Sequence, residues 1–279
     1  MKSLNITIIG TMFTIVYAFY QTPASAQKSN TDKSIFTETM VEMTWEQVRD
    51  AADKKAIVLL PVGIVEEHGP HMDLSPDIYL SVIGCRLVKE ELAKQGVNAI
   101  IAPPYYWGIS KTTDMFPGTF TVSPETFRAM MFDIIGCLKA WGFKSIFVGN
   151  LHGDPLHIKT IASSMQEIRD SLKINAYDIS TLPHEEPERK PNPKQNTKMY
   201  KPDYHAGANE TKAIWDFFPD KVDVAKTKSL PPQNKFAPLG YVGDPANFEK
   251  GNGKETLQEI TNEAAQTIID FLNNKNEKP

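Results

Sequence analysis

A chain of 279 residues, of which 41% are hydrophobic, is long enough for one α/β domain with a full hydrophobic core. Its 30 Lys and Arg residues stand against 34 Asp and Glu residues, which gives a formal net charge of −4 at pH 7. This balance excludes the basic composition typical of proteins that bind nucleic acid or anionic membranes, so we expect neither partner.

The first 26 residues have the pattern of a secretory signal peptide. Lys2 supplies the positive charge, residues 4–17 are mostly apolar, and Ala24-Ser25-Ala26 is a small-residue cleavage site. A transmembrane anchor is the alternative, but the apolar run is short for a bilayer span. The pattern therefore predicts a periplasmic or secreted protein that has no membrane contact once residues 1–26 are removed.

The remaining chain is interpreted as one secreted domain over residues 36–279, preceded by a polar and disordered segment, residues 27–35. A secreted location permits a disulfide between Cys85 and Cys137. Both cysteines fall in apolar, helix-like segments, however, so two buried free thiols are the favoured interpretation.

Strand-like and helix-like segments then alternate along the chain. The expected strands are 56–62, 98–102, 145–148 and 174–179. The expected helices are 44–52, 77–95, 123–141, 155–172, 209–217 and 256–273. Thr44 and Ser123 are the expected N-caps of the first and third helices. Strands separated by helices predict a mainly parallel sheet covered on both faces.

Two segments depart from this alternation. Residues 182–204 are rich in Pro, Lys, Glu and Asn and are long for an internal connection, so they form a lid, an assembly arm or an exposed loop. Residues 227–252 are rich in Pro and Gly and are expected to be irregular.

The segment that follows the first strand, residues 61–71, carries the most chemistry. It reads PVGIVEEHGPH and is followed by Asp77. Carboxylates and imidazoles are the ligands that hold catalytic divalent metals. Glu66 and His68 follow the carboxyl end of a strand, where open α/β sheets bind ligands, and in an extended chain their spacing points both side chains to one side. We therefore expect them to share a site.

Three later segments also place polar groups at the ends of regular elements. Residues 150–154 (NLHGD) end a strand, and residues 205–211 (HAGANET) open a helix. Residues 116–119 (FPGT) form a turn that offers backbone N–H groups to a substrate oxygen. A lone histidine is more often a surface or core residue than a ligand. Three histidines in matching positions at the ends of regular elements, His68, His152 and His205, instead indicate a metal or catalytic site.

Together these four motifs resemble those of the creatininase (creatinine amidohydrolase) family. The family's Pro-x-Gly-Ser-x-Glu-Gln-His-Gly-Pro-His segment is matched by residues 61–71, and its following Asp by Asp77. Its Phe-Pro-Gly-Thr, Asn-Gly-His and His-Ala-Gly-x-x-Glu-Thr segments are matched in the same order by the three later segments. The resemblance covers about residues 40 to 272 and implies a three-layer α/β/α sandwich, commonly assembled as a homo-hexamer.

The resemblance also implies two divalent metal ions per chain, either zinc, manganese or iron. One ion is expected on Glu66, Asp77 and His152, and Asp77 is expected to bridge to the second ion, which His68 also binds. The remaining carboxylate of the second ion is either Asp154 or Glu210, and both alternatives stay open.

The catalytic residues implied by the resemblance are His205 and Glu210. His205 matches the family's catalytic histidine and would relay a proton to the leaving nitrogen. Glu210, if it binds no metal, would orient His205 or a bound water. The residues expected to contact the substrate are His71, Gly118 and Thr119.

Several positions depart from the family pattern. They are Ile64 in place of Ser, Glu67 in place of Gln, Thr113 in place of His, Leu151 in place of Gly and Ala208 in place of an acid. The metal ligands are kept while the substrate surroundings differ, which argues against creatinine itself as the substrate.

The favoured function is a metal-dependent amidohydrolase that uses a metal-activated water to cleave a C–N bond, other than a peptide bond, in a small cyclic or linear amide. One alternative is a metal-dependent hydrolase of an ester, a lactone or a peptide-like bond. The other is a non-catalytic secreted protein that binds a ligand on the same scaffold.

Overall fold

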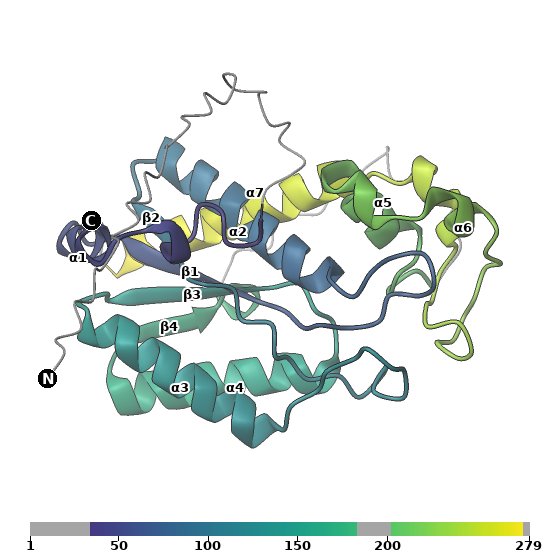
Figure 1. Cartoon of the computed structure of the whole chain (residues 1–279). Coiled ribbons are helices and arrows are strands. Elements are labelled where there is room, and N and C mark those ends of the chain that lie inside the picture. Colours follow the sequence, from purple (N-terminus) through teal and green to yellow (C-terminus); the bar gives the residue numbers. More distant parts are fainter. Residues whose placement is uncertain (1–33, 183–201, 276–279) are drawn as a thin grey trace, which may run out of the picture.

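The computed structural model describes residues 34–182 and 202–275 (Figure 1). The expected signal peptide 1–26 and almost all of the irregular segment 182–204 lie outside these ranges, so those two predictions stay predictions. Within the described ranges, no helix is both long and apolar enough to cross a bilayer.

The described residues contain a four-stranded sheet in the order β2-β1-β3-β4, and every neighbouring pair of strands is parallel. The strands are β1 Ile57–Val62, β2 Ala99–Ile101, β3 Ser145–Asn150 and β4 Asn175–Asp178. Each expected strand is present, and the expected parallel sheet is confirmed. β1 is buried along its whole length, as its continuous apolar sequence requires in a sheet covered on both faces.

Helices connect and flank these strands (Figure 1). The α-helices are α1 Trp45–Asp53, α2 Pro76–Lys94, α3 Pro124–Ala140, α4 Pro155–Leu172, α5 Ala208–Phe217, α6 Val224–Lys228 and α7 Gly253–Asn274. Thr44 caps α1 through a capping box, and Ser123 caps α3, as expected. The segment 227–252 is less irregular than expected, because α6 ends in it and a 3-10 helix spans Pro245–Lys250.

Alternate side chains of β1 enter two different cores. Val58 and Leu60 pack with residues of α3 and α4, such as Phe127, on one face of the sheet. Ile57 and Leu59 pack with residues of α2 and α7 on the other face. The protein is therefore a three-layer α/β/α sandwich, as the sequence predicted.

The strand order creates a crevice at the carboxyl ends of β1 and β3. The chain passes from β1 outward to its neighbour β2, and later from β3 outward to β4 on the opposite side. Ligands of open α/β sheets bind where the connections of two adjacent strands diverge in this way. A third apolar cluster, which includes Ile214 of α5 and Tyr241, packs beside α2 and holds α5 over this crevice.

The two cysteines are free. Cys85 is buried in α2, as expected, and burial raises the pKa of its thiol to about 12. The expectation of a buried thiol is wrong for Cys137, which lies on an exposed position of α3.

Candidate metal centre

Five side chains from four separate segments meet at the carboxyl end of the sheet. Glu66 and His68 follow β1, His152 follows β3, Asp77 lies in the first turn of α2, and Glu210 lies in the first turn of α5. Gly63 permits this meeting, because a Cβ there would lie 2.8 Å from the carbonyl oxygen of Asp77.

The five side chains form two groups of possible metal ligands, and Glu66 and His68 form a third group with His205. In the first, His152 Nδ1 lies 3.0 Å from Glu66 Oε2 and 3.1 Å from Asp77 Oδ2. In the second, His68 Nε2 lies 3.3 Å from Glu210 Oε1 and 3.8 Å from Asp77 Oδ1. Asp77 belongs to both groups and turns one oxygen to each, which is the arrangement of a bridging carboxylate.

Backbone carbonyls fix which nitrogen of each imidazole carries the hydrogen. His68 Nδ1 donates to the carbonyl of Glu66 at 3.0 Å, and His152 Nε2 donates to the carbonyl of Ile109 at 3.0 Å. In a neutral ring the other nitrogen then presents a lone pair to the carboxylates. Facing lone pairs repel unless a cation lies between them, so the donor set fits a metal ion.

The remaining geometry also fits metal ions. Glu66 Oε2, Asp77 Oδ2 and His68 Nε2 are buried and make no hydrogen bond among the described residues. Two ligands at about 2.0–2.1 Å from a tetrahedral ion lie about 3.3 Å apart, which is close to most of the separations found here.

Electrostatics at this site favour positive charge. Burial alone would lower the pKa of His68, but Glu210, Asp77 and Glu66 outweigh it and raise the pKa to about 10. Burial is likewise outweighed at His152, where Asp77 and Glu66 raise the pKa to about 11. Burial would raise the pKa of Glu66, but the histidines hold it well below its ordinary value. A divalent cation satisfies this demand for positive charge while displacing protons from the imidazoles.

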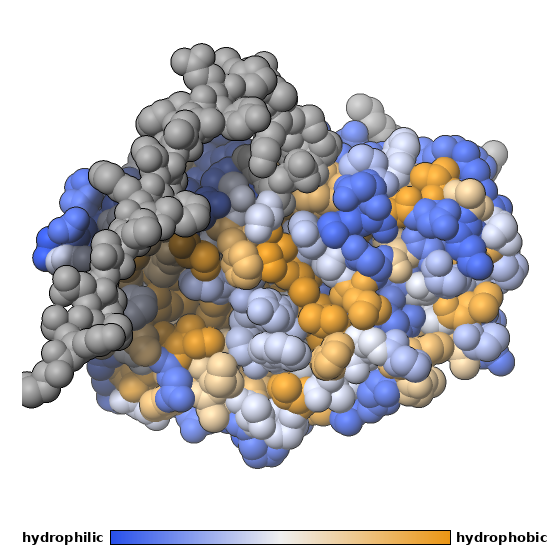
Figure 2. Space-filling model, in the orientation of Figure 1, coloured by the Kyte–Doolittle hydropathy of each residue, from blue (hydrophilic) through white to orange (hydrophobic). Residues whose placement is uncertain are grey.

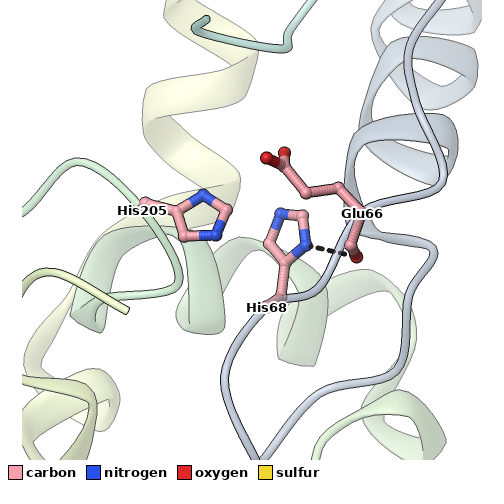
Figure 3. Close-up of side chains that lie close together, drawn as sticks. All are labelled: Glu66, His68 and His205. Carbon is pink, nitrogen blue, oxygen red and sulfur yellow. Dashed lines mark hydrogen bonds between the residues drawn. The ribbon is translucent and has the colours of Figure 1, made fainter. Parts of the chain in front are cut away.

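His205 lies against the second group of ligands. Its Nε2 donates to the backbone carbonyl of Glu67 at 3.0 Å, and its ring centroid is 4.5 Å from that of His68. Figure 3 shows the Glu66 side chain reaching back toward both imidazole rings. The ring of Phe236, 5.3 Å away, packs against His205 as well. His205 is therefore held beside the ligands through its own set of contacts.

Glu67 is a second buried acid at the site. Its Oε1 lies 3.5 Å from His205 Nε2, and its Oε2 accepts a hydrogen bond from the N–H of Gly69 at 2.9 Å. Gly240, at φ +74°, lies so close that a Cβ there would overlap the Glu67 carboxylate. Thr119 accepts a hydrogen bond from the Glu67 N–H at 3.2 Å.

Asp154 lies outside both ligand groups. Its Oδ1 caps α4 by accepting from the N–H groups of Leu156 at 2.8 Å and His157 at 3.2 Å. Its Oδ2 accepts from the N–H and hydroxyl of Thr112 and from the N–H of Lys111. With its oxygens occupied in this way, Asp154 holds α4 and a loop together, and the geometry favours Glu210 as the second carboxylate.

The three residues expected to contact the substrate, His71, Gly118 and Thr119, are held by contacts with other residues of the protein. His71 is buried, and its Nε2 lies 2.9 Å from the hydroxyl of Thr211. Burial and the neighbouring His68 lower the pKa of His71 to about 4. Gly118, at φ +100°, packs on Leu74. Together with the bond from Glu67 to Thr119, these contacts place the Phe-Pro-Gly-Thr turn against the ligand-bearing loop.

Three supporting residues were not identified from the sequence as parts of the site. The hydroxyls of Ser110 and Thr113 both donate to Glu66 Oε1. His157 accepts from the N–H of Ile109 at 3.2 Å and donates to Asn150 Oδ1 at 3.1 Å. Its ring thereby links the backbone of Ile109 to the side chain of Asn150, which itself bonds the backbone of His152. Thr113 had a signal, since it replaces a histidine of the family pattern, whereas His157 resembles any polar residue on a helix.

The α/β/α sandwich thus carries paired groups of possible metal ligands beyond the carboxyl ends of its parallel strands, which is the architecture of a metal-binding α/β protein. A model of the creatininase family, described as creatinine amidohydrolase, matches residues 41–268. The chain belongs to the creatininase family.

Two relatives with assigned functions illustrate the range of the family. The mycofactocin precursor peptide peptidase of Mycolicibacterium smegmatis is 26% identical over 227 residues, covering 76% of this chain and 84% of the relative. The creatinine amidohydrolase of Pseudomonas putida is 24% identical over 253 residues, covering 85% of this chain and 93% of the relative.

Solved structures show the same fold. A creatininase with a tryptophan-to-alanine substitution has a TM-score of 0.64 at 21% identity and covers 85% of this chain and 98% of its own. A manganese form and a zinc–zinc form of creatininase each have a TM-score of 0.60 at 21% identity.

Proposed function

We propose that this protein is a dinuclear-metal hydrolase that cleaves a C–N bond in a small amide. The observation that carries this proposal is the pair of ligand groups that share Asp77. Glu66, Asp77 and His152 would hold one ion, and His68, Asp77 and Glu210 the other. The manganese and zinc–zinc forms of creatininase support zinc or manganese as the occupants, and iron is compatible with the same ligands.

Bound divalent ions supply a nucleophilic water near neutral pH and polarise a carbonyl oxygen. The side chains of the protein would orient the metal ligands and transfer the proton. Ser110 and Thr113 hold Glu66 in place through its Oε1 and leave Oε2 directed at His152. Nε2 of His205 donates to the carbonyl of Glu67, so Nδ1 would accept a proton and pass it to the leaving nitrogen.

A peptide-like bond is the second candidate substrate, and a specific observation favours it. The relative from Mycolicibacterium smegmatis is a precursor peptide peptidase and matches 76% of this chain. A peptide bond and a simple amide have the same electrophilic carbonyl, so the same ligands and the same proton relay would serve both.

The test is turnover of a panel of simple amides, lactams, dipeptides and esters, followed by detection of released amine or alcohol. We expect amine release that stops on chelation and returns when zinc or manganese is added. Turnover of dipeptides alone would favour the peptidase alternative, and turnover of esters alone would contradict C–N cleavage. Tight binding of an amide without turnover would instead identify a non-catalytic binding protein.

We also propose that the protein is exported, which rests on the leader pattern of residues 1–26. Export predicts a mature N-terminus at Gln27, which intact-mass measurement of the protein from its native periplasm or medium would detect. A cytoplasmic full-length chain would contradict it.

A further inference from the structure

A cavity of about 250 Å³ lies apart from the two ligand groups, between the carboxyl ends of β3 and β4 and the helices α2 and α7. Its walls include the apolar side chains of Val88, Leu151, Ile179, Ile260 and Ala264. Pockets for drug-sized ligands usually enclose roughly 300–1,000 Å³. This cavity therefore suits a molecule smaller than those.

Asp178, the last residue of β4, is the buried acid among the described residues that line this cavity. Asp178 lines the cavity although the residue is only 2% exposed. Oδ1 accepts hydrogen bonds from the N–H of Ser180 at 3.0 Å and from its hydroxyl at 2.8 Å. Oδ2 is buried and has no hydrogen-bond partner among the described residues. A buried carboxylate oxygen without a donor is costly, so this atom is poised to accept one.

The charge of the lining selects the sign of the ligand. Among the described residues, the lining contains two acids, Asp178 and the exposed Glu263, and no Lys, Arg or His. Burial raises the pKa of the Asp178 carboxyl, as expected for an acid that no cation compensates. A positively charged donor would restore the ionised form and fill the open position on Oδ2 at once.

We propose that this cavity binds a small organic ammonium ion, with its charged nitrogen on Asp178 Oδ2 and its aliphatic part against the wall formed by α2 and α7. The apolar walls favour an alkylammonium over a bare metal ion, which would require several further oxygen ligands.

The cavity also adjoins the loop that carries His152. Ser81 lines the cavity, donates to the carbonyl of Val62 at 2.8 Å and accepts from the N–H of Leu151 at 3.3 Å. Asn150, another lining residue, holds the backbone of His152 through both ends of its amide. A ligand here would contact the backbone that presents a metal ligand without touching the ligand groups themselves.

The experiment is a calorimetric titration of the purified protein with butylammonium chloride, with butanol as the uncharged probe of similar shape. We expect butylammonium to bind and butanol to show no binding. In Asp178→Asn the charge is lost, but the amide oxygen still accepts the bonds from Ser180, because Asn is as good a cap as Asp. We expect the dissociation constant of this variant for butylammonium to be higher than that of the wild type by about tenfold or more, as the loss of a charged hydrogen bond implies.

Two further variants make the result decisive. Ala264→Met fills the cavity from α7 without changing the carboxylate and should weaken binding as well, whereas Glu263→Gln at the exposed rim should bind like the wild type. Thermal unfolding checks that each variant is folded, and a repeat with zinc-loaded protein excludes binding of the ammonium ion to the acidic ligand groups of the metal centre. No binding to the wild type, or equal binding by the wild type, Asp178→Asn and Ala264→Met, would overturn the proposal.

Discussion

At the scale of single residues, two backbone carbonyls determine what the histidines of the candidate centre offer. The carbonyl of Glu66 takes the hydrogen of His68, and the carbonyl of Ile109 takes that of His152. Each ring then presents its other nitrogen to carboxylates. The sequence predicted the carboxylate and imidazole ligands but gave no sign of these tautomers, because they depend on atoms contributed by the folded backbone.

His205 is the residue whose replacement separates catalysis from metal binding. Its ring lies against the ring of His68, a candidate ligand. Its orientation, however, is fixed by the hydrogen bond from its Nε2 to the backbone carbonyl of Glu67. We expect His205→Ala to keep the metal content of the wild type and to lower kcat by about two to four orders of magnitude, as is typical for loss of a general acid–base. Steady-state kinetics on the best amide of the panel, with metal analysis of the same samples, measure both. Full activity in this variant would show that the proton takes another route.

Glu67 is expected to act by positioning His205. Its carboxylate is 3.5 Å from His205 Nε2, and it accepts the N–H of Gly69. An amide oxygen accepts the same bonds, so we expect Glu67→Gln to retain kcat within a few-fold. Glu67→Ala removes both contacts and should lower kcat while KM and metal content stay unchanged. Equal kinetics for Glu67→Ala and the wild type would contradict a positioning role.

At the scale of elements, the candidate centre is built from the ends of strands and helices rather than from their interiors. The carboxyl ends of β1 and β3 and the first turns of α2 and α5 supply the ligands. These elements were predictable, because apolar runs bounded by Gly, Pro and capping residues indicate strands and helices. The choice between Asp154 and Glu210 was not, since both are acids in or beside the first turn of a helix. Only the fold shows that Asp154 caps α4 while Glu210 approaches His68.

The different roles of Asp154 and Glu210 can be measured. Asp154→Ala removes the cap of α4 and should lower the free energy of unfolding by about 1–2 kcal/mol with both metals retained. Glu210→Ala should lose one of two ions with a smaller change in the stability of the metal-free protein. Denaturant unfolding and metal analysis test the pair, and loss of metal in Asp154→Ala alone would reverse the assignment.

The pH dependence of the Asp154 contribution has a definite sign. Burial would raise the pKa of this carboxyl, but the hydrogen bonds from Lys111, Thr112, His157 and Leu156 hold it below its ordinary value. The stabilisation is thus complete above the unfolded pKa of about 3.9 and is lost as the pH falls through the lower folded value. The difference in stability between wild type and Asp154→Ala should therefore shrink in acid, and a difference that grows in acid would contradict the assignment.

At the scale of the whole molecule, the order of the strands places the centre. Alternating strands and helices predicted a parallel sheet, but not that β1 and β3 would be neighbours. That adjacency brings residues about 90 positions apart, such as Glu66 and His152, within 3.0 Å. It follows from the packing of whole layers, which no local pattern encodes.

A homo-oligomer stays a prediction from the family resemblance, and the surface offers a place for it. An apolar hollow of about 820 Å³ lies between α1 and α3, and Figure 2 shows hydrophobic side chains gathered there. Trp45 and Trp141 line this hollow and are 69% and 54% exposed. Large exposed apolar patches mark interaction surfaces. We expect light scattering to give an oligomer for the wild type and a smaller species for the double variant Trp45→Ser/Trp141→Ser. A wild-type monomer would contradict the prediction.

The most direct test of a dinuclear centre is the metal content of the protein, purified without chelator or metal-binding tag and measured by elemental mass spectrometry. We predict about two divalent ions per chain in the wild type. Asp77→Ala should lose both, because Asp77 is the carboxylate common to the two ligand groups. A wild-type protein that holds no divalent metal, and takes up none from zinc or manganese, would contradict the account.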